Sequence, residues 1–363
     1  MKVSWLDCHK MLRDLGSFAD LEKVLDFSPP QLPNIDMAGL FTIFGRLPKF
    51  PDDFQIIRGK SWAHDGVQIT ELSWSTGFGP RTQALLLLPE NATTPLPGAL
   101  FLHSHDDVKE FGKEKLVDGA GKLPESLSWV KREHYGNRSA ANELAKRGFA
   151  VLVFDCFMWG SRRFTLENMP ARLKELFGKQ DYELLAIAHE SVVLAKYLSL
   201  FGATLAGLVN FDDRIAFEIA KTLPEISDSI STIGLSGGGA RAIYLHATQP
   251  ELKTVVSIGA MATYRSMLPE HISPHSWLIF PHGLAAKSDW PALCLINKAT
   301  PLYVQFCGND QLFTKAGMAE ADAILQSAFE SGGGQYRSGT YPVRHSFTVE
   351  MQEDAFDWLV ENA

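Results

Sequence analysis

Apolar positions along the first third of the chain follow a strand-like pattern. Two runs, Val67–Trp74 and Thr82–Leu88, are rich in apolar and β-branched residues. Gly77, Gly79 and Pro80 lie between them. Glycine and proline between two such runs indicate a turn, so we predict an antiparallel hairpin.

From residue 99 onward, short apolar runs alternate with stretches in which apolar residues recur at helical spacing. The predicted strands are Ala99–His103, Phe149–Phe154, Ser231–Leu235, Thr254–Ile258, Leu302–Phe306 and Tyr336–Tyr341. The predicted helices are Ala140–Arg147, Tyr182–Leu200, Ile215–Leu223, Gly238–Thr248, Lys315–Phe329 and Glu350–Val360. Repeated strand–helix units predict an α/β protein with a mostly parallel central sheet flanked by helices.

Three segments depart from this alternation. In residues 1–60, helical patterns such as Phe18–Leu25 alternate with prolines, and we predict a short helical extension packed on a main domain of residues 61–363. Residues 104–138 are charged and glycine-containing, which indicates a long loop. Residues 261–300 are rich in Pro, His and Trp and lie between two predicted strands, so we expect a cap-like insertion there.

Composition and charge exclude some classes of protein. The 363 residues carry a net charge of −8 and show no basic stripe, so we predict no nucleic-acid partner. The longest basic cluster is interleaved with acidic residues and is interpreted as a solvated face; it comprises Lys109, Lys113, Lys115 and Lys122. No apolar run approaches the ~20 residues that span a bilayer, and no signal-like core opens the chain. We therefore expect a cytoplasmic protein without a membrane partner, with Cys156 and Cys307 as buried thiols.

A glycine-rich motif marks the most informative turn. Ser236 lies in the pattern G-x-S-x-G, between Gly234 and Gly238, after a predicted strand and before a predicted helix. A serine on such a sharp turn needs glycine on both sides, because larger side chains would collide. The backbone N–H of Gly237, at the start of the helix, could stabilise an oxyanion. Ser236 is thus a candidate nucleophile; the alternative is a turn that only packs tightly or holds a phosphate.

A serine nucleophile needs a histidine base and a carboxylate that orients it. In α/β proteins that carry a serine on such a strand-to-helix turn, the acid and then the histidine follow the serine along the chain. His345 follows the last predicted strand, and Asp310 follows the strand Leu302–Phe306, at the sheet edge where active sites form. A turn or helix cap is the alternative role for Asp310, and a plain loop residue for His345. The competing candidates are Asp289 and Glu320 as acids, and the other histidines after Ser236 as bases: His246, His271, His275 and His282.

These motifs resemble a known group of proteins. Gly234-Leu-Ser-Gly-Gly238, Cys307-Gly-Asn-Asp310 and the segment from His345 to Leu359 resemble the α/β-hydrolase superfamily, in its dienelactone-hydrolase-like and acetyl-xylan-esterase-like branch. The resemblance covers roughly residues 80–363. It implies the α/β-hydrolase fold and a triad of Ser236, Asp310 and His345. The implied activity is that of a serine hydrolase that cleaves a small-molecule carboxylic ester through an acyl-enzyme, and we expect no cofactor.

The resemblance also implies that the loop after the strand Ala99–His103 contributes to the oxyanion hole. That loop often carries a glycine, and Ser104 stands here instead. We predict that the backbone N–H of His105 or Asp106 completes the hole together with Gly237.

Two other functions stay open from the sequence. The spacing His103-x-His105-x-Asp107 is similar to the core of metallo-β-lactamase-type hydrolases, and such residues could hold Zn²⁺. The fuller motif has a histidine where this chain has Val108. The second alternative is a non-catalytic protein that has kept the fold.

Aromatic residues near the predicted strand ends suggest a pocket for an acyl or aryl group. We expect Phe157 and Trp159, after the strand that ends at Phe154, and Trp277, in the cap-like insertion, to bind substrate. The alternative is that these aromatic side chains pack the insertion onto the sheet.

Overall fold

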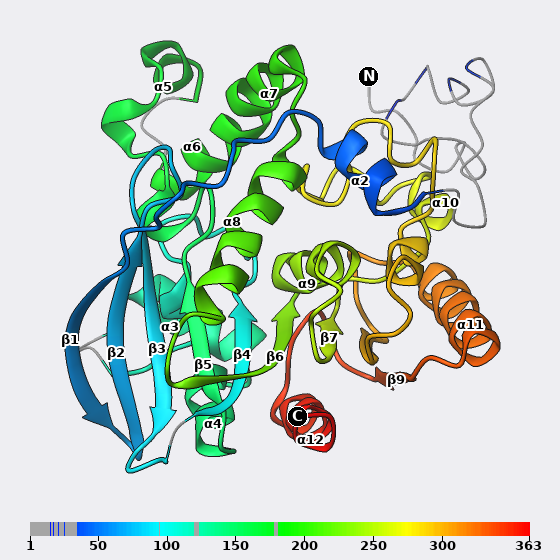
Figure 1. The fold of residues 1–363 in the computed structure, drawn as a ribbon. Helices are drawn as coiled ribbons and strands as arrows, with labels where there is room; N and C mark the ends of the chain where they lie inside the picture. Colours follow the sequence, from blue (N-terminus) through cyan, green and yellow to red (C-terminus); the bar gives the residue numbers. More distant parts are fainter. Residues whose placement is uncertain are drawn as a thin grey trace.

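A computed structural model of the chain describes residues 35–363 except 94, 120–122 and 178–180, together with residues 15, 17, 21 and 25. The described residues form one nine-stranded sheet with the order β1-β2-β3-β5-β4-β6-β7-β8-β9, which Figure 1 shows running from β1 at the left to β9 at the right. The strands are β1 (Ile57–His64), β2 (Val67–Trp74), β3 (Thr82–Pro89), β4 (Leu96–Leu102), β5 (Ala150–Phe154), β6 (Ile226–Leu235), β7 (Val255–Ile258), β8 (Leu302–Cys307) and β9 (Tyr336–Tyr341).

The sheet is mostly parallel. β4 pairs in parallel with both β5 and β6, and each following pair through β9 is parallel. β1, β2 and β3 form an antiparallel meander that joins the sheet through an antiparallel pairing of β3 with β5. The predicted hairpin and the predicted mostly parallel sheet are both confirmed.

Helices cover both faces of this sheet. They are α2 (Met37–Phe44), α3 (Glu125–His134), α4 (Ala140–Lys146), α5 (Ala171–Phe177), α6 (Tyr182–His189), α7 (Ala195–Phe201), α8 (Leu205–Ala220), α9 (Gly237–Thr248), α10 (Tyr264–Met267), α11 (Lys315–Gly332) and α12 (Val349–Glu361). Along β4, Leu100 and Leu102 enter a core shared with α2, α8, α9 and α11, whereas Ala99 and Phe101 enter a core shared with α4 and α12. This alternation follows from the two-residue period of a strand.

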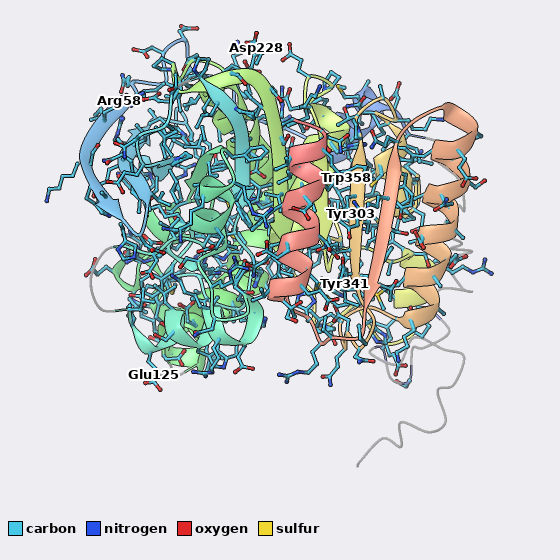
Figure 2. All side chains as sticks on the ribbon, turned by 90° about the horizontal axis from the view of Figure 1, so that it is seen from below. Arg58, Glu125, Asp228, Tyr303, Tyr341 and Trp358 are labelled. Atoms are coloured by element: carbon cyan, nitrogen blue, oxygen red, sulfur yellow. The ribbon has the colours of Figure 1, made fainter. Side chains whose placement is uncertain are left out.

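The second core is closed by aromatic and hydrogen-bonded contacts. Figure 2 shows Trp358 of α12 beside Tyr303 of β8, and their ring centroids lie 5.7 Å apart. The Trp358 indole N–H donates to the Thr254 hydroxyl at 3.0 Å. The hydroxyls of Tyr303 and Tyr341 are 2.8 Å apart, so β8, β9 and α12 are tied together where the chain approaches its C-terminus.

Threonine side chains mark the starts of the main helices. Thr204, Thr314 and Thr348 accept hydrogen bonds from the backbone N–H groups three residues ahead, at the starts of α8, α11 and α12. Such N-caps satisfy backbone donors that have no partner within the helix. Gly333 caps the C-terminal end of α11, and its φ of 68° suits glycine.

Several elements were not predicted from the sequence, among them β1, α3 and the short helices α5 and α10. β1 has an exposed polar pattern rather than alternating apolar residues, because within the part of the chain that the structure describes it is an edge strand that pairs with β2 alone. It begins at Ile57 and therefore crosses the predicted boundary at residue 60. α3 lies inside the segment 104–138 that was predicted as loop, and its sequence is mostly polar because few of its side chains are buried. The pattern at residues 18–25 lies mostly outside the described residues.

The helix that runs through residues 182–201 combines α6, a π-helical turn at Glu190–Leu194, and α7. By length and composition it is apolar enough to cross a membrane, and 33% of the apolar window is buried in the protein. The sequence analysis did not identify a helix of this length and hydropathy, because polar residues such as Glu190 and Lys196 interrupt the apolar run in the sequence without ending the helix. Tyr197, Leu200 and Phe201 are exposed near its C-terminal end.

The segment 261–300 contains α10 and the short 3₁₀ helix Pro291–Leu295. Several of its apolar side chains, including Trp290 and Leu293, belong to the main core. The Trp290 indole N–H donates to Ala260 O at 2.7 Å. Only the part from Pro274 to Ile279 lines the cavity described below.

Candidate active site

Ser236 lies on a strained turn between β6 and α9. Its φ of 56° and ψ of −119° are unusual for a residue other than glycine. A Cβ atom on Gly238 would lie 2.1 Å from Leu102 O, and one on Gly234 would lie 2.4 Å from the carbonyl carbon of Gly238. Both positions therefore require glycine, which explains the G-x-S-x-G pattern in steric terms.

Asp310 and His345 are hydrogen-bonded to each other. Asp310 follows β8, its side chain is 0% exposed, and its Oδ2 lies 2.6 Å from His345 Nδ1. Its second oxygen, Oδ1, accepts a hydrogen bond from the backbone N–H of Leu312 at 2.8 Å. His345 stands in the loop between β9 and α12, and its Nε2 is buried without a hydrogen-bond partner among the described residues. The imidazole is thus oriented at one nitrogen and unpartnered at the other.

One cavity of about 220 Å³ brings Ser236, Gly237 and His345 together. The remaining lining residues are His105, Asp106, Asp107, Trp129, His134, Pro274, His275, Ser276, Leu278, Ile279 and Leu312. Larger cavities surround α7, and one of them has a volume of about 890 Å³. Neither Ser236 nor His345 lines any of these cavities. Volume alone would therefore select the wrong place, and the chemistry of the lining selects the smaller cavity.

The loop after β4 lies against the start of α9. A Cβ atom on Gly237 would be 3.1 Å from the backbone N of His105, so these two backbone segments are in contact. Lys115 Nζ donates to Ser104 O at 2.8 Å and to His105 O at 2.9 Å. Asp106, with a φ of 52°, accepts a hydrogen bond from the Ser104 hydroxyl. These contacts leave the loop little conformational freedom.

Charged side chains are buried beside the loop after β4. Burial alone would raise the pKa of the Asp106 carboxyl, but Lys115, two neighbouring histidines and the Ser104 hydroxyl together outweigh burial, and the pKa lies below its ordinary value. Burial lowers the pKa of Lys115 despite that carboxylate. Lys109 and Lys115 are 1% and 0% exposed. The interpretation of the basic cluster as a solvated face is therefore wrong for these two lysines, and Lys122 lies outside the described residues.

The predicted substrate-binding aromatics do not line the cavity. Phe157 borders the larger hollow near α7, and Trp159 is 2% exposed and packs its ring on His103 and His105. Trp277 is 47% exposed and faces a different hollow. The prediction that these three aromatic residues line the cavity of Ser236 is therefore wrong. After β5 the chain turns into the core, and in the segment 274–279 the neighbours of Trp277 line the cavity whereas Trp277 does not.

The alternative acids and one alternative base, His246, lie elsewhere. Asp289 accepts hydrogen bonds from the backbone N–H groups of Tyr264 and Trp290, and Glu320 accepts one from Thr263. His246 Nε2 donates to Cys294 O, and burial lowers the pKa of this histidine to about 4. None of the three lines the cavity that contains Ser236.

The side chains of the candidate metal motif do not converge on one point. His103 donates from Nδ1 to Ser104 O, and its Nε2 lies 3.6 Å from the Cys156 sulfur. His105 points its Nε2 toward Glu190, and Asp107 is 77% exposed at its side chain. No group of three His, Cys, Asp or Glu side chains that could hold a metal occurs among the described residues. The geometry therefore does not favour the zinc alternative.

Trp129 and His134 were missed from the sequence, and His275 was considered only as an alternative base; all three line the cavity. Trp129 and His134 come from α3, and His134 donates from Nδ1 to His345 O at 3.1 Å. His275, in the segment 261–300, donates from Nε2 to Leu312 O at 3.0 Å. A histidine without a motif carries no signal in a single sequence, and α3 itself was predicted as loop.

Comparison with known proteins agrees with this architecture. No protein-family model matches the chain. A candidate hydrolase of Bacillus subtilis (strain 168), YtaP, is 23% identical over 283 residues, which are 77% of this chain and 83% of YtaP.

Solved structures with similar folds include three esterases. A candidate acetyl xylan esterase from Bacteroides fragilis NCTC 9343 superposes with a TM-score of 0.66 at 16% identity, covering 93% of this chain and 87% of that one. A glucuronoyl esterase from Solibacter usitatus has a TM-score of 0.58 at 14% identity, over 88% of both chains. Acetyl xylan esterase 1 from Thermoanaerobacterium sp. JW/SL YS485 has a TM-score of 0.53 at 14% identity, over 94% and 98%. The strand order, the flanking helices and these likenesses identify the chain as a protein of the α/β-hydrolase fold.

Proposed function

We propose that the protein is a serine hydrolase that cleaves a carboxylic ester, with Ser236 as nucleophile, His345 as base and Asp310 as the acid that orients the base. One observation carries the proposal: an imidazole held at Nδ1 by a buried carboxylate, with Nε2 unpartnered, shares a cavity with a serine on a strained turn. Nucleophile, base and orienting acid in this arrangement are the requirements for acyl transfer.

In the proposed mechanism, His345 Nε2 takes the Ser236 hydroxyl proton as the oxygen attacks the ester carbonyl. The carbonyl oxygen becomes an oxyanion, and the backbone N–H groups of Gly237 and His105 donate to it, since these segments touch at the cavity wall. His345 then gives its proton to the leaving alcohol. Water, activated by the same imidazole, releases the acid from the acyl-enzyme.

The size of the cavity points to a short acyl group. At about 220 Å³ it is smaller than the ~300–1,000 Å³ typical of sites for larger ligands. The names of the similar solved structures, acetyl xylan esterases and a glucuronoyl esterase, support ester cleavage as the reaction. Trp129, which is 41% exposed at the cavity, offers a flat apolar surface for the alcohol part of the ester.

The remaining expectations join this proposal. We propose that residues 1–60 are an extension of one catalytic domain and that the segment 261–300 shapes the cavity. A cytoplasmic location is supported by the free, buried thiols of Cys156, Cys294 and Cys307, which suit a reducing compartment. Fractionation of cells that express the tagged chain tests the location.

Labelling with a fluorophosphonate tests the proposed chemistry. The wild-type protein should be labelled at Ser236, and Ser236→Ala should abolish both labelling and the hydrolysis of p-nitrophenyl acetate. Ser229→Ala is a matched control, because Ser229 lies in the same strand and its hydroxyl has no hydrogen-bond partner among the described residues. Turnover near the wild-type rate by Ser236→Ala would refute the proposal and leave the metal alternative. A wild-type protein that is neither labelled nor active on the ester would instead favour the non-catalytic alternative. A panel of acetate, butyrate and octanoate esters and acetylated sugars then defines the substrate.

A further inference from the structure

Two segments that line the cavity, the loop of His105 and the segment 274–279, meet at one buried carboxylate of the helix 182–201. Glu190 is 3% exposed and opens the π-helical turn Glu190–Leu194. Its Oε1 accepts a hydrogen bond from the Ser276 hydroxyl at 2.9 Å. Its Oε2 lies 2.5 Å from Lys109 Nζ and 3.5 Å from His105 Nε2. Glu190 does not itself line the cavity, but His105 and Ser276 do.

The helix is distorted where it supplies this carboxylate. π-helical turns are rare and occur frequently at functional sites. Burying a carboxylate is costly unless a cation compensates it, and Lys109 provides that cation from within the core, 3.5 Å above the Trp159 ring. Burial acts to raise the pKa of Glu190, but Lys109 and His105 outweigh it and the pKa lies far below its ordinary value. Glu190 is therefore ionised at neutral pH.

His105 is held on both sides of its ring. Its Nδ1 lies 3.1 Å from the backbone N–H of Asp107 and 3.2 Å from the carboxylate of the same residue. A neutral ring accepts from that N–H, and a charged ring donates to that carboxylate; both forms carry a proton on Nε2, which faces Glu190. The separation of 3.5 Å exceeds hydrogen-bond length but lies within the range of charge attraction.

We propose that Glu190 is a positioning residue for the proposed ester hydrolysis, on which this inference rests. Through His105 it holds the loop backbone against Gly237, where the oxyanion donors must be aligned. Through Ser276 it holds the segment 274–279 over the cavity. Removal of one oxyanion donor costs on the order of 10²–10³-fold in kcat, so a partial displacement should cost less, about 10–100-fold.

The test compares Glu190→Gln with Glu183→Gln. Glu183 is a matched control from the same helix: it accepts hydrogen bonds from the backbone N–H groups of Lys109 and Glu110 but contacts neither His105 nor Ser276. We expect Glu190→Gln to lower kcat for p-nitrophenyl acetate about 10–100-fold with KM changed less than about threefold, because the donors act on the transition state. Glu183→Gln should keep kcat within about threefold. Equal losses in both variants, or a folded Glu190→Gln with wild-type kcat, would overturn the inference.

A second variant covers the case in which Glu190→Gln does not fold. His105→Ala removes the imidazole but keeps the backbone N–H, and we expect the same loss of kcat. If Glu190→Gln folds, the double variant should be no worse than the more damaging single one, because both changes break one link. Wild-type kcat in His105→Ala, or losses that multiply, would also overturn it. Ser236→Ala, assayed alongside, separates the two ideas: its retained activity refutes the serine mechanism, and retained kcat in Glu190→Gln refutes only the role of Glu190.

Discussion

Replacing Asp310 by Asn tests the proposed base most directly, because the structure fixes how the new amide must turn. One carboxylate oxygen of Asp310 accepts from the Leu312 N–H, and the other faces His345 Nδ1. In Asp310→Asn the amide oxygen should stay with the Leu312 N–H, since that donor would otherwise be buried without a partner. The NH₂ group then points at Nδ1 and donates to it. His345 would carry its proton on Nε2 and could no longer accept the Ser236 proton.

The size of the effect follows from this loss of the correct tautomer. A triad with the wrong tautomer loses about 10⁴-fold in kcat. The backbone donors of the oxyanion hole are untouched, so we expect a loss of 10²–10⁴-fold, which is about 3–5 kcal/mol at ~1.4 kcal/mol per tenfold change. KM should change little, because Asp310 does not line the cavity. The far-ultraviolet circular dichroism spectrum and the melting temperature should stay near those of the wild type.

Steady-state hydrolysis of p-nitrophenyl acetate over a pH range measures this prediction. His345→Ala should be about as damaging as Asp310→Asn, and the double variant should not be additively worse, because the two residues act as one unit. A loss smaller than about tenfold in a folded Asp310→Asn would refute the assignment. Independent, multiplying losses would do the same.

Three further predictions concern the turn, the pH dependence and the metal alternative. Gly238→Ala should destabilise the protein by about 1–3 kcal/mol and lower kcat, because the added Cβ would overlap Leu102 O. Urea unfolding and the ester assay measure these effects, and an unchanged free energy of unfolding would contradict the steric argument. The buried His246, with a pKa of about 4, takes up a proton at about pH 6.5 only when unfolded, so stability should fall as the pH falls from 6.5 toward 4. His246→Gln should show a shallower fall over this range, and an identical slope would reject the assignment. Ester hydrolysis should survive EDTA, whereas loss of activity that Zn²⁺ restores would favour a metal at His103, His105 and Asp107.

The sequence predicted those features that depend on local pattern. A strand followed by G-x-S-x-G and a helix specifies its own turn, and the structure shows that turn at Ser236. The positions of Asp310 and His345 follow from strand ends, and the structure places their side chains in contact. Their catalytic roles stay predictions until Ser236, Asp310 and His345 are tested in the assay.

Long-range contacts and side-chain direction could not be predicted in the same way. The partner of Lys109 is Glu190, which is 81 residues away, and nothing in the charge pattern distinguishes this buried lysine from a solvated one. Trp159 follows a strand end as expected, but a neighbouring residue, Met158, has a φ of 77°, and the chain packs the indole into the core. Such directions are determined by tertiary packing, which a single sequence does not encode locally.

The edge strand β1 has a consequence for association between chains. Its pairing with β2 shifts between Arg58 and Ser61, so Gly59 and Lys60 stand opposite Glu71, whose carboxylate accepts the Lys60 N–H. Exposed strand edges can recruit strands from other molecules and start aggregation, and bulges and charged side chains oppose this. The bulge bends the strand, and Arg58 and Lys60 are exposed beside it. Pairing of β1 with a strand of a second molecule is thereby disfavoured. The polar residues that prevented the prediction of β1 from the sequence therefore also oppose aggregation in concentrated solution.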